Sequence, residues 1–328
     1  MESPQHIKSR LKSVKNIGQI TKAMEVVSAT KMRRAQEVAL RSRPYAFKAL
    51  ELLETLARVT QNEELRMKNV ELPLAEKREI KKTLLVVVTS DKGLAGAFNT
   101  QVFRTVEQFL AGERTPPGLP QGEDQEGSRT IEVVPVGKRA VSYFTRRNAK
   151  IVESFTGFGD YAMPEEIEPL ANLLVTGFLE GSWDRVVTIS THFRSTLKQT
   201  PLARQVLPVE VEKIAETVKE IVPEHGRYSD SEKLKPNTYN LKPVEYILEP
   251  SPEETLNALV PHLVTMQLYH VVLEANASEH SARMVAMKTA SDNASDLADA
   301  LTLEFNKARQ AGITKEIIEI TSTMNALT

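Results

Sequence analysis

Two long stretches without helix-breaking residues place the strongest constraint on how this chain folds. Residues 5–43 contain one glycine, Gly18, and no proline, and residues 262–311 contain neither. Glycine and proline are the residues that most disfavour a helix interior. The sequence therefore predicts one long helix over 1–60, another over 251–328, and a globular domain between them.

Both predicted helices carry apolar residues at a spacing typical of coiled coils. From Leu256 to Ala308 a strict three-four spacing selects sixteen positions, thirteen of them apolar, as in a coiled-coil seam. In the first helix the spacing drifts, and the seam is predicted at Ile7, Leu11, Val14, Ile17, Ile20, Met24 and Val27. Because the first helix leads into the middle domain and the last leads out, we expect an antiparallel coiled coil.

The middle of the chain alternates predicted strands and helices, which is typical of an α/β domain. Strands are predicted over 83–89, 131–136, 151–155 and 185–191, and helices over 99–110, 138–147 and 164–180. We expect a Rossmann-like domain over 80–208. Seven glycines or prolines among the nineteen residues 112–130 predict a mobile loop inside it. An inserted surface element is predicted over 209–243.

The segment TSDKGLAGAFN, residues 89–99, raises the alternative of a nucleotide-dependent enzyme built on the α/β domain. A dinucleotide fingerprint needs three glycines and an acidic residue after the second strand. Here only Gly93 and Gly96 are present, and Lys138 and Arg139 follow that strand. The sequence contains no GxxxxGK[ST] phosphate loop. We therefore interpret the segment as a structural strand-to-helix turn.

The sequence indicates no catalytic residue, cofactor site or metal site. The six histidines are scattered and there is no cysteine, so metal-ligand spacings are missing. His270 and His280 fall on the predicted seam, which favours packed or partner-facing histidines. No stretch has the apolar length of a membrane span, and the polar N-terminus is unlike a secretory signal. These features predict a soluble chain.

The two predicted terminal helices carry net charges of opposite sign. The whole chain is nearly neutral, with 42 basic and 43 acidic side chains, so it lacks the general basic character of nucleic-acid binders. Residues 5–43 nevertheless carry a local net charge of +8, and residues 251–328 carry −5. Opposite charges favour pairing of the helices and leave a basic face for acidic partners. A nucleic-acid binder is a third reading, which the adjacent acidic helix disfavours.

Several segments together resemble the gamma subunit of bacterial F-type ATP synthase. They are IKSRLKSVKNIGQITKAMEVVSATKMRRAQ, SRPY, TSDKGLAGAFN, EPSPEE, ASEHSARMVAMKTASDNASDL and FNKARQAGITKEIIEI. The resemblance covers both terminal helices and the first half of the middle domain, in the family's order. It implies an antiparallel coiled coil on a Rossmann-like α/β domain, in agreement with the reading from the residues.

The resemblance also implies a function. The chain would be the central rotor shaft of a proton- or sodium-translocating ATP synthase, without catalytic activity or a cofactor of its own. Its partners would be the alpha and beta subunits of the catalytic hexamer, the epsilon subunit and the membrane rotor ring. Nucleic acid is not among them. The expected location is the cytoplasmic face of the bacterial cell membrane, reached only through these partners.

Contact residues carry over from the family position by position. The residues that match contacts with the alpha and beta subunits are Met24, Lys31, Arg33, Arg34, Arg309, Gln310, Thr314 and Glu316. Those that match contacts with the membrane ring and the epsilon subunit are Arg43, Tyr45, Tyr246 and Glu249.

Overall fold

The computed structural model describes residues 3–61, 73–114, 130–209 and 252–327. The predicted element over 209–243 and the predicted loop over 112–130 therefore lie almost entirely outside the described residues.

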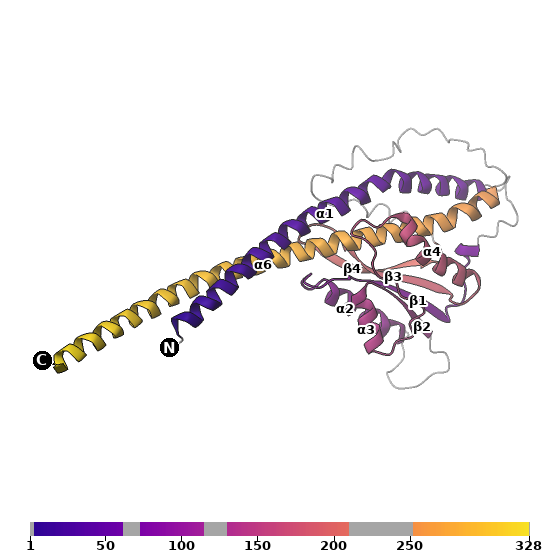
Figure 1. The fold of residues 1–328 in the computed structure, drawn as a ribbon. Coiled ribbons are helices and arrows are strands. Elements are labelled where there is room, and N and C mark those ends of the chain that lie inside the picture. The colour runs from indigo at the N-terminus through magenta and orange to yellow at the C-terminus, as the bar shows by residue number, and fades with distance from the viewer. Residues whose placement is uncertain (1–2, 62–72, 115–129, 210–251, 328) are drawn as a thin grey trace. The chain divides into compact units, whose positions relative to one another are not determined.

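The chain divides into two compact units, which two long helices share (Figure 1). Helix α1 (Pro4–Gln61) has 58 residues and helix α6 (Pro252–Leu327) has 76. The first unit comprises Met1–Thr30 and Arg283–Thr328, and the second comprises Lys31–Ala282. The expected long terminal helices are thus present.

The first unit is a pair of helix segments that run in opposite directions (Figure 1). They approach closely at Gly18 of α1, where an added Cβ would lie 3.4 Å from the Cβ of Ala294 on α6. Ile7 and Ser28 of α1 and Met287, Ala298 and Leu301 of α6 are also buried. Small residues at the contact let the helix backbones come close together.

The predicted apolar seam of α1 is wrong at three positions of its second half, whereas Met24 is half-buried. Ile17, Ile20 and Val27 are 53%, 59% and 53% exposed. The inward-facing positions continue instead through Gly18, Thr21 and Ser28, which extend the three-four spacing of Ile7, Leu11 and Val14. These inward positions are small or polar, so the spacing of apolar residues alone does not identify them, and their aliphatic neighbours face outward.

The second unit is built on a mixed four-stranded sheet in the order β2-β1-β3-β4. Strand β1 (Lys82–Val88) pairs in parallel with β2 (Thr130–Val136) and with β3 (Arg185–Phe193). Strand β4 (Gln199–Leu207) pairs antiparallel with β3. The central strand β1 is buried along almost its whole length, as expected for a parallel strand covered on both faces.

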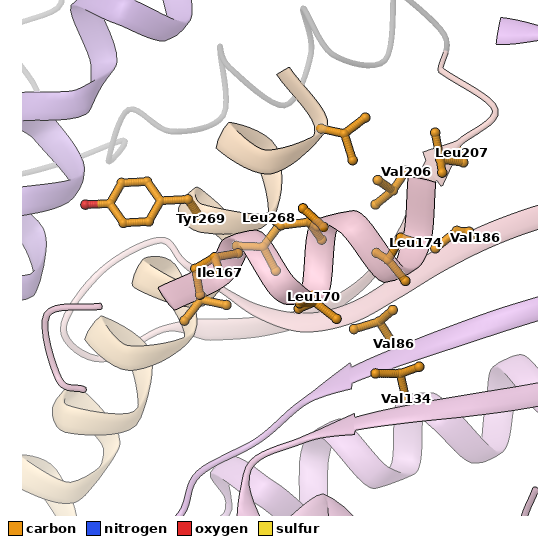
Figure 2. Close-up of a cluster of buried hydrophobic side chains, with 14 of the residues drawn as sticks. Val86, Val134, Ile167, Leu170, Leu174, Val186, Val206, Leu207, Leu268 and Tyr269 are labelled. Carbon is orange, nitrogen blue, oxygen red and sulfur yellow. The ribbon is translucent and has the colours of Figure 1, made fainter. Parts of the chain in front are cut away.

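Helices cover both faces of this sheet. Leu85 and Val87 of β1 pack with residues of α2 (Phe98–Arg114) and α3 (Lys138–Arg146). Leu84, Val86 and Val88 point to the opposite face, toward α4 (Pro164–Leu179) and α6. Figure 2 shows this second core, with α4 between the strands and Leu268 of α6. A short 3-10 helix, η2 (Pro73–Ala75), packs its Leu74 into the same core.

The observed strands differ from the predicted ones at two places. Residues 151–155 were predicted as a strand but make only isolated bridges to β2, at Ile151 and Phe155. Strand β4 was missed because Pro201 lies inside it, and proline is rare in central strands. An edge strand tolerates proline because one side of it needs no hydrogen-bond donors. The remaining predicted strands and helices of the middle domain are present within a few residues.

Candidate functional site

The turn after β1 is held by hydrogen bonds to its own neighbours. The two carboxylate oxygens of Asp91 accept the backbone N–H groups of Lys138 and Gly157, at 2.8 and 2.9 Å. The side chain of Asn99 accepts hydrogen bonds from the backbone N–H and hydroxyl of Ser90. The segment that resembles a nucleotide loop therefore ties β1 to the starts of α2 and α3.

The same turn supplies acceptors for the N-terminus of α3. In nucleotide-binding folds the free N–H groups of a helix N-terminus hold the phosphate. At the start of α3 the N–H of Lys138 is taken by Asp91, that of Arg139 by the carbonyl of Ser90, and that of Ala140 by the hydroxyl of Thr89. The first N–H groups of α3 therefore have acceptors within the chain, and the segment acts as a strand-to-helix turn.

Replacing Asp91 with alanine is expected to lower the free energy of unfolding by about 1–2 kcal/mol, because two backbone donors lose a charged acceptor. Urea unfolding followed by the fluorescence of Trp183 measures this change, since Trp183 is the single tryptophan and is buried. Asp91→Asn keeps one acceptor oxygen and serves as the control, with a smaller expected loss. Equal stability of Asp91→Ala and the wild type would contradict the assigned capping role.

A buried ionic network joins α6 to the sheet. Glu274 of α6 lies with one oxygen 3.1 Å from Nδ1 of His192 on β3 and 3.3 Å from a guanidinium nitrogen of Arg204 on β4. Burial alone would raise the pKa of Glu274, but His192 and Arg204 outweigh it and hold that pKa below its ordinary value. No local pattern in the sequence indicates this network, because its members are far apart along the chain.

Of the three basic residues of α1 that were predicted to contact a partner, two contact other residues of this chain. Lys31 forms an ion pair with Asp160, and the guanidinium of Arg34 lies 5.1 Å from the ring centroid of Tyr161. Arg33, between them in sequence, is exposed. Two of the three basic side chains that were predicted to face a partner are therefore engaged with the loop before α4.

The other predicted contact residues differ in exposure. Met24 is half-buried in the first unit, whereas the four predicted positions near the end of α6, Arg309, Gln310, Thr314 and Glu316, are exposed. Tyr246 and Glu249 lie outside the described residues, as do the side chains of Arg43 and Tyr45.

Large aliphatic side chains are exposed on both helices of the first unit. They include Ile17, Ile20, Val26 and Val27 of α1, and Leu297, Leu303, Ile313, Ile317, Ile318 and Ile320 of α6. Scattered apolar residues are normal on protein surfaces, but gathering so many on one helix pair is typical of a surface that a partner covers.

Acidification is expected to destabilise the protein through Asp160. Burial opposes ionisation of Asp160, but Lys31 and His280 outweigh it and hold its pKa below the ordinary value. A carboxylate with a lowered pKa contributes stability above the unfolded-state pKa and loses this contribution as the pH falls through the folded-state pKa. The contribution, about 1 kcal/mol for a partly exposed pair, is therefore expected at neutral pH and begins to be lost below about pH 4.

Urea unfolding at several pH values between 7 and 3 tests this expectation. Asp160→Asn should be less stable than the wild type at pH 7, and the difference should shrink as the pH approaches 3. A difference that stayed constant over this range would show that ionisation of Asp160 does not contribute.

Among the described residues, no cluster of three or more histidine or acidic side chains is arranged to hold a metal ion. In the same part of the chain, no helix is both long and apolar enough to cross a membrane.

Comparison with known proteins identifies relatives along the whole chain. The family model described as ATP synthase matches residues 3–327. The ATP synthase gamma chain of Roseiflexus castenholzii is 40% identical over 327 residues, which cover 100% of this chain and 99% of the relative. The ATP synthase gamma chain of Chloroflexus aurantiacus is 40% identical over 329 residues, with full coverage of both chains.

Solved structures share the fold at lower sequence identity. The rotor of the Euglena gracilis mitochondrial ATP synthase in rotational state 1 gives a TM-score of 0.56 at 18% identity, covering 94% of this chain and 98% of that chain. The OSCP/F1/c-ring structure from the same organism in rotational state 3 gives 0.61 at 19% identity, covering 99% and 94%.

Proposed function

Because this chain belongs to the ATP synthase gamma chain family, we propose that it is the central rotor shaft of an F-type ATP synthase. It couples rotation of a membrane ring, driven by protons or sodium ions, to conformational cycling of the catalytic beta subunits. The chain is not itself catalytic. It lies at the cytoplasmic face of the bacterial membrane through its partners, which are the alpha, beta and epsilon subunits and the rotor ring.

The observation that carries this proposal is the antiparallel helix pair with aliphatic side chains facing outward. Two helices that only supported a globular domain would bury such residues as Ile17, Ile20, Ile317 and Ile320, which are instead exposed. A surrounding ring of subunits would cover them. We propose that the pair winds as a coiled coil, because the buried positions of α6 follow the spacing of a coiled-coil seam.

Polar contacts with the ring are proposed at the residues carried over from the family. Arg33 is exposed on α1 and suits an acidic loop of a beta subunit. Arg309, Gln310, Thr314 and Glu316 are exposed on the last turns of α6 and suit loops deeper in the ring. Met24 of α1 is a further proposed contact. Lys31 and Arg34 add positive charge near Arg33. Arg43, Tyr45, Tyr246 and Glu249 are proposed contacts of the membrane ring and the epsilon subunit.

The proposed mechanism is a shift of populations in the surrounding subunits. A basic α1 beside an acidic α6 presents faces of different charge in different directions. Each beta subunit therefore meets a different surface and is stabilised in a different conformation. Rotation changes which face each subunit meets, and only this difference in contact energy drives the cycle.

Reconstitution into an ATP synthase depleted of its gamma subunit tests the proposal. The wild-type chain should hydrolyse no ATP alone and should restore ATP-driven ion pumping to the depleted complex. Arg33→Glu is a sharper probe than reversal of all three basic residues, because Lys31 and Arg34 also contact the loop before α4. It should reduce pumping several-fold.

The matched control is Arg104→Glu, which reverses an exposed charge on α2. This variant should pump like the wild type. Failure of the wild-type chain to restore pumping would overturn the proposed function, and normal pumping by Arg33→Glu would remove Arg33 from the contact.

A further inference from the structure

The loop between residues 157 and 163 connects both long helices to the sheet within the second unit. Three consecutive residues of this loop, Gly159, Asp160 and Tyr161, each contact α1, α6 or both. Lys31 is the first residue of this unit and His280 lies two residues from its end. The contacts therefore fall at the helix positions that directly precede and follow the first unit in sequence.

On α6 two side chains one turn apart contact the loop. The side-chain amide of Asn276 donates to the carbonyl of Gly159 at 3.0 Å, and Nε2 of His280 lies 2.8 Å from one carboxylate oxygen of Asp160. Residues four apart lie on the same helix face, so both side chains reach the loop together. His280 is buried, so this contact is sheltered from water.

On α1 the loop is held by two side chains that share a face. The ammonium of Lys31 donates to the second carboxylate oxygen of Asp160, and the guanidinium of Arg34 stacks over Tyr161. Asp160 thus has one polar side-chain partner from each long helix, with a separate oxygen for each.

The same loop is anchored to the carboxyl edge of the sheet. The backbone N–H of Gly157 donates to Asp91 at 2.9 Å, and that of Phe155 donates to the carbonyl of Pro135 in β2 at 3.0 Å. Ala162 is almost fully buried in the core that α4 and α6 share. The loop is therefore tied to the sheet as well as to both helices.

We propose that Asp160 is a positioning residue that locks α1 and α6 in register with each other and with the sheet, so that the two helices turn as one body. This inference rests on the proposed function as a rotor shaft. Apolar packing is not directional and resists sliding of one helix along another only weakly. Hydrogen bonds and ion pairs to one carboxylate depend on direction and distance, so they oppose axial and rotational slip.

Asp160→Asn in the reconstituted complex is the first test. The variant should still hydrolyse ATP, but the number of ions pumped per ATP should fall by about two-fold or more, as for other residues that couple distant sites. In the same variant, amides around Lys31 and His280 should exchange hydrogen about ten-fold faster, because local opening becomes easier.

Glu107→Gln is the matched control. Glu107 also accepts from a cation and a second donor, Arg147 and the hydroxyl of Tyr143, both at 2.8 Å, but it joins only α2 and α3. It should leave the pumping ratio and the exchange near Lys31 unchanged. If the number of ions pumped per ATP fell in both variants, the cause would be general destabilisation, and the proposal would be overturned.

Variants of His280 keep the test decisive should Asp160→Asn fail to fold. His280→Gln retains an N–H donor and should keep most of the pumping ratio, whereas His280→Ala should lower it. If wild type, Asp160→Asn and His280→Ala pumped the same number of ions per ATP, Asp160 would not be a positioning residue. The proposed rotor function would be unaffected. If the wild-type chain itself restores no pumping, the proposed function fails instead.

Discussion

Replacing Glu274 with methionine is expected to lower the free energy of unfolding of the second unit by about 3–5 kcal/mol, because the guanidinium of Arg204 would remain buried without its carboxylate. Glu274 and Arg204 are both largely buried, and their atoms lie 3.3 Å apart. Methionine is similar in size to glutamate, so little of the loss comes from an empty space. Urea unfolding followed by the fluorescence of Trp183 measures the change.

The control removes both charges. With Arg204→Met added to Glu274→Met, much of the lost stability should return, because the buried guanidinium that lost its carboxylate is removed and two apolar side chains pack in its place. If the double variant were as unstable as the sum of the single variants, the penalty would come from lost packing and not from the charge.

Replacing Gly177 with alanine is the second large effect expected. An added Cβ would lie 2.0 Å from Cζ2 of Trp183, far inside van der Waals contact. Trp183 cannot move freely, because its indole N–H donates to the carbonyl of Leu174 and its ring is buried. Overpacking of this kind costs about 1–3 kcal/mol or more. Thermal unfolding followed by circular dichroism measures it independently of the indole environment.

Gly112 in α2 supplies the matched comparison. It also lies in a helix, but an added Cβ would meet nothing within 4 Å. Gly112→Ala should therefore raise stability by about 0.5–1 kcal/mol, because alanine favours the helix more than glycine does. The same substitution thus has opposite effects at the two sites. A stabilising Gly177→Ala would mean that Trp183 relaxes without losing its contacts.

Local patterns in the sequence predicted the secondary structure well where one signal dominated. The terminal helices follow from stretches without glycine or proline, and β1 follows from a run of aliphatic residues. Strand β4 was missed because Pro201 is a local argument against a strand, and only its edge position makes proline acceptable. The segment from Ile151 to Phe155 has a strand-like composition, but it has only two bridges to β2.

The contacts that join distant segments could not be predicted in the same way. Asp160 lies 129 residues from Lys31 and 120 from His280, and no local spacing links them. His280 was expected to be packed or to face a partner, and it is buried against Asp160. Lys31 and Arg34 were assigned outward roles from a family resemblance, which does not reveal that their side chains also serve the chain itself. The assigned contacts with other subunits stay predictions.

Both edge strands of the sheet carry a feature that disfavours pairing with a strand of another molecule. At one border, Pro201 of β4 offers no N–H, which interrupts the row of donors that a strand from another molecule would need. At the other border, Val133 of β2 is already bonded to Lys150 and Val152 of its own chain. A newly made copy that still awaits its assembly partners is thereby hindered from polymerising through its sheets, even while its aliphatic helix surfaces are uncovered.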